Sequence, residues 1–132
     1  MPSTHVELAK EGLEAFNRRD VEGMLATLDP EVELVPLRAI LQGERYRGYE
    51  QFKSYLTGLA EDWDEFTVAP DEFRELDSER VLILGTIHAR GRGSGVEVNY
   101  PAAWITTVRG GKVVRMHFYN DEAHAIESSP PG

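Results

Sequence analysis

The chain has 132 residues, no cysteine, and a formal net charge of -9 from 23 acidic and 14 basic side chains. This length fits one domain, residues 1–132, that buries its own core. The acidic balance argues against a nucleic-acid-binding protein, and the lack of cysteine excludes disulfides and thiolate metal sites. Because no apolar run of about 18 residues is present, we expect a cytoplasmic protein with no membrane partner.

The N-terminal part of the chain predicts two helices. Residues 5–17 carry apolar side chains at three- and four-residue spacing, which is typical of an amphipathic helix. Asp20 then has the position of an N-cap for a second, short helix. Pro30 ends this helix, because proline disfavours helical backbone in the residue before it.

An extended segment and a third helix follow. Residues 31–35 alternate charged and apolar side chains, as a half-buried strand does, with Val32 and Leu34 on the apolar side. Residues 36–48 have no clean period, so they predict a loop. Residues 49–60 again place apolar side chains on one helical stripe.

The second half of the chain predicts a sheet. Residues 63–76 alternate loosely, and Pro70 favours an edge strand or a bulge there. Residues 80–121 contain three segments rich in β-branched and aromatic residues, separated by glycine turns. The order of elements predicts an α+β fold in which helices cover one face of a bent antiparallel sheet, with a frayed tail at residues 128–132.

The glycine turns suggest how the last three strands pair. A two-residue turn at Gly110-Gly111 places Ile105 opposite Met116, and a turn at residues 91–95 extends the pairing by one strand. Residues directly opposite share a face of the sheet. One face is suited to pack on helices or to line a pocket, and it carries Ile83, Gly85, Ile87, Asn99, Pro101, Ala103, Ile105, Val114, Met116 and Phe118.

The opposite face is also rich in large apolar and aromatic groups, which is unusual for a face turned to water. We expect this outer face to form a homodimer. Its predicted contact residues are Leu82, Leu84, Tyr100, Trp104, His117 and Tyr119.

The segments EAFNRRDVEGMLATLDPEVELVP and GGKVVRMHFYND, with the elements between them, resemble the nuclear transport factor 2-like superfamily and its SnoaL-like members. The resemblance runs from about Val6 to about Glu127. It implies a cone-shaped fold, in which a curved mixed or antiparallel sheet wraps around N-terminal helices and encloses an apolar cavity. Relatives commonly dimerise through the outer sheet face. Because the family includes hydrolases, isomerases, dehydratases, polyketide cyclases and non-catalytic binders, the fold assigns no reaction.

The positions at which such relatives carry catalytic groups hold apolar residues or glycine here. Relatives similar to limonene epoxide hydrolase hold and activate a water there, and steroid-isomerase relatives use a carboxylate and a tyrosine. Side chains without an acceptor cannot activate water. The matching residues are Val32, Leu34, Gly85, Ile87 and Phe118 for the first chemistry, and Val35 and Gly12 for the second.

Polar candidates remain at the strand ends. Asn99 and Asn120 either orient a polar ligand atom or cap the backbone, and Asp121 is either a base or an N-cap. We expect no cofactor and no metal, because no carboxylate completes a ligand set with the histidines. The three arginines within residues 38–47 would meet an anionic ligand at the mouth of a pocket.

The leading prediction is a pocket that binds an apolar or mixed small molecule. The alternatives are a cyclase, isomerase or hydratase acting on a polyketide- or terpenoid-like substrate, and an interaction module that uses the outer sheet face. The predicted pocket residues are Phe16, Val32, Leu34, Arg38, Tyr46, Phe52, Tyr55, Trp63, Ile87, Asn99, Ala103, Ile105, Met116, Phe118 and Asn120.

Overall fold

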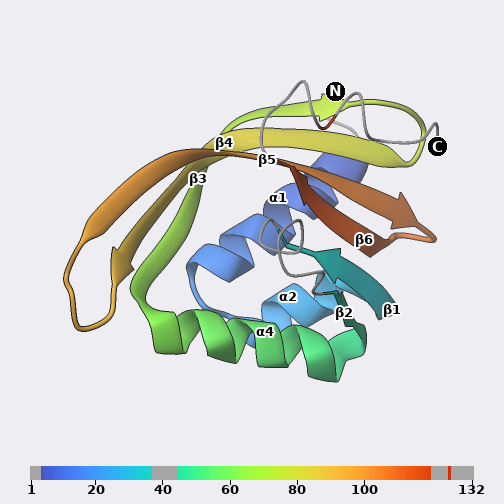
Figure 1. Ribbon diagram of the computed structural model, residues 1–132. Helices are drawn as coiled ribbons and strands as arrows, with labels where there is room; N and C mark the ends of the chain where they lie inside the picture. The colour runs from blue at the N-terminus through green and yellow to red at the C-terminus, as the bar shows by residue number, and fades with distance from the viewer. Residues whose placement is uncertain (1–3, 37–44, 120–124, 126–132) are drawn as a thin grey trace.

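The computed structural model describes residues 4–36, 45–119 and 125. Its described strands form a six-stranded sheet in the order β2-β1-β6-β5-β4-β3, in which β1 and β6 are parallel and the other neighbours antiparallel. The sheet curves over the helices, so its concave face meets them (Figure 1). The predicted α+β fold is confirmed. The elements are α1 (Thr4–Asn17), α2 (Val21–Thr27), β1 (Leu28–Val35), β2 (Tyr46–Arg47), α4 (Gly48–Asp62), β3 (Trp63–Glu75), β4 (Arg80–Gly91), β5 (Glu97–Arg109) and β6 (Lys112–Tyr119).

Side-chain hydrogen bonds fix the ends of the first two helices. Asp20 is the N-cap of α2, as predicted, and its Oδ1 accepts from the backbone N–H of Gly23 at 3.0 Å. At the end of α1, the side chain of Asn17 both donates to and accepts from the backbone of Val68, at 2.9 Å each. Since β3 is an edge strand, Asn17 satisfies backbone groups that no neighbouring strand reaches, and it anchors α1 to the sheet.

The predicted loop after β1 is partly wrong, because Tyr46 and Arg47 form the short strand β2 beside β1. Arg38 falls within residues 37–44, which lie outside the described residues. The predicted last helical turn after residue 120 also lies outside them, apart from Ala125. No described helix is long and apolar enough to cross a membrane.

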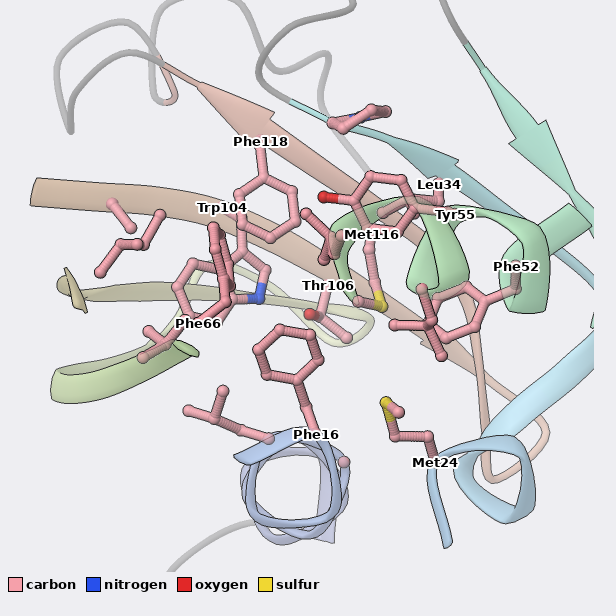
Figure 2. A pocket seen from close by; sticks show the side chains of 18 of the residues that line it. Phe16, Met24, Leu34, Phe52, Tyr55, Phe66, Trp104, Thr106, Met116 and Phe118 are labelled. Atoms are coloured by element: carbon pink, nitrogen blue, oxygen red, sulfur yellow. The ribbon is translucent and has the colours of Figure 1, made fainter. Parts of the chain in front are cut away.

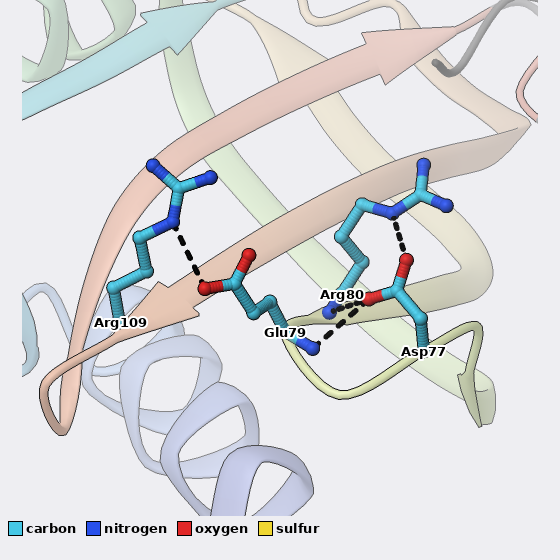
Figure 3. Close-up of polar contacts among 4 residues, drawn as sticks. All are labelled: Asp77, Glu79, Arg80 and Arg109. Carbon is cyan, nitrogen blue, oxygen red and sulfur yellow. Dashed lines mark hydrogen bonds and ion pairs between the residues drawn. The ribbon is translucent and has the colours of Figure 1, made fainter. Parts of the chain in front are cut away.

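The corner between β3 and β4 is held by one carboxylate (Figure 3). Asp77 Oδ1 accepts from the backbone N–H groups of Glu79 and Arg80 at 2.9 Å each, and Oδ2 accepts from Arg80 Nε at 2.7 Å. Glu79 Oε2 in turn accepts from Nε of Arg109 at 3.1 Å, which ties the corner to the end of β5. The hydrogen bond from the Glu79 backbone and the Arg80 guanidinium hold the pKa of Asp77 below its usual value.

The sheet bends where β3 passes Pro70. The register between β3 and β4 shifts between Pro70 and Glu72, which is the bulge that proline favours. On the facing strand, a Cβ at Gly85 would lie 2.5 Å from the backbone oxygen of Ala69, so a larger residue has no room. The bulge and this glycine let the two strands approach closely and curve over the helices.

The Gly110-Gly111 turn is confirmed, with φ of 59° and 77°, but the pairing predicted from it is wrong for most of β5. The register shifts within residues 107–108, so a β-bulge displaces the strands by one residue. Ile105 therefore pairs with His117 rather than with Met116. A turn fixes the register only as far as the first bulge.

The other hairpin adds a second displacement of one residue, because Arg90 pairs with Glu97 rather than with Val96. The two displacements exchange the faces of β5, while β4 and β6 keep the faces predicted for them. The inward side chains of β5 are thus Val98, Tyr100, Ala102, Trp104 and Thr106, and the outward ones are Asn99, Pro101, Ala103 and Ile105.

This exchange corrects the predicted homodimer surface. Tyr100 and Trp104 lie on the concave face and not on the outer face. Leu82 is 0% exposed and Tyr119 is 5% exposed, because both pack within the chain in a cluster that includes Ala125. Four of the six predicted contact residues are therefore not presented to a second copy.

Candidate functional site

A cavity of about 740 Å³ lies between the concave face of the sheet and the helices (Figure 2). This volume is within the range of about 300–1,000 Å³ that is typical of small-molecule sites. The helices contribute apolar side chains from their inner stripes, and the strands contribute alternate residues. Its wall includes Leu8, Gly12, Leu13, Phe16, Met24, Thr27, Leu34, Phe52, Tyr55, Leu56, Leu59, Asp62, Trp63, Phe66, Val68, Ile87, Tyr100, Ala102, Trp104, Thr106, Met116, Phe118 and Tyr119.

The structure brings together eight of the predicted pocket residues. Seven of them come from elements whose inward face the periodicity predicted correctly, namely the helical stripes, β1, β4 and β6, and Trp63 is the first residue of β3. They are Phe16, Leu34, Phe52, Tyr55, Trp63, Ile87, Met116 and Phe118.

Three residues predicted for the pocket lie outside it, because the face of β5 that turns inward is the opposite of the predicted one. Ala103 and Ile105 point outward, and Ile105 packs on Leu82 in the outer cluster. Asn99 is exposed on the outer face, where its Oδ1 accepts from Nδ1 of His88. Asn99 therefore does not contribute a polar group to the cavity.

Two further predicted residues lie close to the cavity but not on its wall. Val32 is 1% exposed and packs in the core cluster that contains Phe52. Tyr46 belongs to β2 and rests against the ring of Tyr55, with a centroid distance of 5.1 Å. The remaining candidates, Arg38, Asn120 and Asp121, lie outside the described residues.

The sequence reasoning missed Trp104 and Thr106, which point into the cavity from the same face of β5 (Figure 2). Both are nearly buried, at 4% and 3% exposure. The Trp104 ring stacks on Phe118 with centroids 5.1 Å apart and an interplanar angle of 18°. The alternation in β5 contained this signal, but only the correct register shows which alternate set faces inward.

These two side chains bring hydrogen-bond donors into an apolar space. Neither the indole N–H of Trp104 nor the hydroxyl of Thr106 hydrogen-bonds to any described residue. The other inward threonine differs, because the hydroxyl of Thr27 donates to the backbone oxygen of Met24 at 2.7 Å. Trp104 and Thr106 are thus placed to receive an acceptor atom.

Few titratable groups reach the cavity. Among the described residues that line it, Asp62 is the one acidic residue, and no histidine, lysine or arginine is present. Burial raises the pKa of the Tyr100 phenol above its usual value of 10.0, so this group stays protonated at neutral pH. The described part of the chain also contains no group of three or more histidine and carboxylate side chains that could hold a metal.

Two arginines of the predicted cluster, Arg45 and Arg47, are described, and neither is on the wall of the cavity. Arg45, Arg47 and Arg115 surround Glu33, with N–O distances of 3.8, 3.9 and 2.9 Å. Glu33 alternates with the inward Leu34 on β1, so this cluster lies on the outer side of the sheet. Arg45 and Arg47 therefore do not meet a molecule inside the cavity.

Comparison with known proteins agrees with this architecture. A solved structure of an NTF2-like protein of unknown function from Burkholderia pseudomallei K96243 is 27% identical, covers 96% of this chain and 97% of its own, and has a TM-score of 0.81. TerC, co-crystallized with polyporic acid, is also 27% identical, with coverages of 95% and 97% and a TM-score of 0.80.

A protein from Pseudomonas putida KT2440, provisionally described as a polyketide cyclase, is 23% identical, with coverages of 96% and 98% and a TM-score of 0.77. No curated protein matches the sequence. The model of the SnoaL-like domain family matches residues 9–116, which is most of the chain. The chain therefore belongs to the SnoaL-like domain family and has the cone fold of the nuclear transport factor 2-like proteins.

Proposed function

We propose that this protein binds a small, largely apolar molecule in the cavity and holds one acceptor atom of that molecule against Trp104 and Thr106. The observation that carries the proposal is the pair of donors without a partner among the described residues, in a wall that is otherwise mainly apolar. Both donors open onto the cavity, since neither is among the fully buried side-chain atoms without a partner in the described residues. A carbonyl or similar oxygen in the ligand would accept a hydrogen bond there, which contributes about 0.5–1.5 kcal/mol net.

The relatives support an organic ligand. TerC has been co-crystallized with polyporic acid and shares 27% identity with nearly the whole chain. The stacked rings of Trp104 and Phe118 offer a flat aromatic wall, which suits a planar ligand.

A pair of matched probes tests the proposal. N-phenyl-1-naphthylamine, whose fluorescence rises in apolar surroundings, serves as the reporter that fluorene and 9-fluorenone displace. The two competitors differ only at one ring carbon, which is a methylene group in fluorene and a carbonyl group in 9-fluorenone. We expect fluorenone to bind about two- to tenfold more tightly, which corresponds to one net hydrogen bond.

The substitution Thr106→Val removes the hydroxyl with little change of shape. We expect it to reduce the preference for fluorenone and to leave the affinity for fluorene unchanged. Thr107→Val is the matched control, since Thr107 is the next residue of β5 and points to the other face. A fluorenone preference that persists in both Thr106→Val and Trp104→Phe would contradict the proposal.

A cyclase, isomerase or hydratase activity is the second candidate, because the same donor pair would polarise a substrate carbonyl. Asp62 is the one acidic residue of the described wall, and the sequence candidates Asp121, as a base, and Asn120, as a polar positioning group, lie outside the described residues. Asn99 no longer qualifies, since it lies on the outer face. Turnover of a polyketide-like substrate that survives replacement of Asn120 and Asp121 would exclude these roles.

A further inference from the structure

A surface recess of about 390 Å³ adjoins the cavity, beside the turn between α1 and α2 and along α4. The recess and the cavity have five apolar lining residues in common, so the two hollows are neighbours. The shared residues are Phe16, Met24, Leu56, Leu59 and Phe66.

The recess differs from the cavity in charge. Arg19 and Lys53 line it, and no acidic residue is among its described lining residues. The chain as a whole carries a net charge of -9, so a recess with cations alone departs from the average surface. Positive charge next to an apolar cavity is complementary to a molecule with an apolar body and an anionic end.

Backbone conformation and one hydrogen bond position Arg19 at this recess. Its φ is 59°, and it is the one described non-glycine residue with positive φ. This conformation belongs to the C-cap of α1, where the backbone N–H groups of Arg19 and Asp20 donate to the backbone oxygens of Phe16 and Ala15 at 3.0 and 2.9 Å. Nη2 donates to the backbone oxygen of Asp64 at 2.8 Å, and no described carboxylate pairs with Arg19. A guanidinium has five N–H donors, so this bond leaves donors for an anion.

Lys53 is also available to an anion. Its Nζ lies 3.5 Å from Oε1 of Glu50, and the Glu50 side chain is 90% exposed. Exposed ion pairs of this kind contribute about 0–1 kcal/mol. An incoming anion therefore displaces Glu50 at little cost.

We infer that the ligand of the cavity is an amphipathic anion, whose apolar body fills the cavity and whose acidic group lies in the recess near Arg19 and Lys53. The inference rests on the proposed function, because it assigns the second end of the same ligand. Phe16 and Phe66 line both hollows and meet edge to face, with centroids 6.0 Å apart, so the inferred ligand would lie against these rings.

Two fluorescent probes that differ by one anionic group test this inference. N-phenyl-1-naphthylamine is neutral, and 8-anilinonaphthalene-1-sulfonate is the same skeleton with a sulfonate that stays charged at all working pH values. We expect the sulfonate to bind about three- to fivefold more tightly in titrations at low salt, as a partly exposed ion pair provides. Raising the ionic strength from about 20 mM to about 300 mM should remove most of this preference.

Single substitutions test which cationic side chains bind the sulfonate. Arg19→Gln and Lys53→Gln should each weaken binding of the sulfonate about two- to fivefold and leave binding of the neutral probe unchanged. Lys53 is exposed on the surface of α4, so its variant retains the fold even if Arg19→Gln does not. Arg18→Gln is the control, because it removes the same charge one residue away, at a side chain that pairs with Asp20 and does not line the recess.

The outcomes separate the two proposals. If neither probe enters the cavity, the proposed function and this inference both fail. If the neutral probe binds and the sulfonate binds no better, only the inference fails. An equal loss of sulfonate binding in the Arg18 and Lys53 variants would also overturn it, since it would indicate a general effect of net charge.

Discussion

Trp104 lies in the wall of the cavity because of its position in β5. Its fluorescence can therefore report the entry of a ligand. The chain contains two tryptophans, and both Trp63 and Trp104 line the cavity. Ligand entry should therefore change the intrinsic fluorescence of the protein without any label.

Gly85 is a position at which the backbone of a neighbouring strand leaves no room for a side chain. A Cβ there would lie 2.5 Å from the oxygen of Ala69 and 3.2 Å from Cα of Pro70, both of which are backbone atoms that cannot rotate away. We expect Gly85→Ala to lower the free energy of unfolding by about 1–3 kcal/mol or more, the usual cost of overpacking. Urea denaturation measures this change.

Gly58→Ala is the matched control for that substitution. Gly58 lies within α4, and a Cβ there meets nothing within 4 Å. Alanine should therefore raise the free energy of unfolding by about 0.5–1 kcal/mol, the difference in helix propensity. If Gly85→Ala raised the free energy of unfolding as Gly58→Ala should, the close approach of β3 to Gly85 would be contradicted.

At the scale of elements, the corner between β3 and β4 should make stability depend on pH. The Glu79 backbone and the Arg80 side chain lower the pKa of Asp77 below 3.8 in the folded chain, so the unfolded chain binds the proton more readily. The stabilisation is therefore present above the unfolded pKa and is lost as the pH falls through the folded pKa.

The substitution Asp77→Asn tests this corner. We expect the variant to be less stable than the parent chain at pH 7, and the difference to shrink when thermal unfolding is followed below about pH 4. Glu72→Gln is the comparison, since Glu72 pairs with Arg74 on the exposed surface and should matter less. A stability gap that is constant with pH would exclude the Asp77 carboxylate as the cause.

The bulge at residues 107–108 is the element-scale feature that decides the site. It exchanges the faces of β5, so Trp104 and Thr106 turn inward while Asn99 turns outward. The hydrophobic pattern agrees with the exchange, because Tyr100 and Trp104 belong to the inward set and Ile105 is the one large apolar residue of the outward set. The register predicted from the turns alone placed these sets on the wrong faces, because one inserted residue reverses a strand.

At the scale of the whole molecule, the homodimer stays a prediction. Two of the six contact residues predicted from the sequence remain available for it. Leu84 and His117 are still partly exposed on the outer face of the sheet. If this face pairs, light scattering should give twice the 14.8 kDa of one chain. Leu84→Glu should then give the mass of one chain, because a charge cannot be buried unpaired at the interface.

Val96→Glu provides the control for the dimer. Val96 is 58% exposed in the turn between β4 and β5, away from the proposed contact. A dimer that survives Leu84→Glu would move the contact elsewhere. A monomeric parent chain would leave the outer face open to a different partner, which is the interaction-module alternative.

The sequence by itself determined the class of fold, the helices, the strands of the meander and eight residues of the cavity wall. These follow from local physics: α1 and α4 carry apolar stripes with the helical period, Asp20 caps α2, and Gly110-Gly111 permits a tight turn. The inward residues of β4 and β6, such as Ile87 and Phe118, follow from alternation alone.

Only the tertiary structure decided which face of β5 turns inward and what the cavity offers a ligand. Strand register depends on contacts between segments far apart in the chain, and one inserted residue reverses a whole strand. The donor pair of Trp104 and Thr106 depends on that register. The recess with Arg19 and Lys53 depends on the packing of α4 against the turn after α1. The alternation in β5 does not by itself say which set of side chains faces inward, and the recess leaves no periodic signal in the sequence.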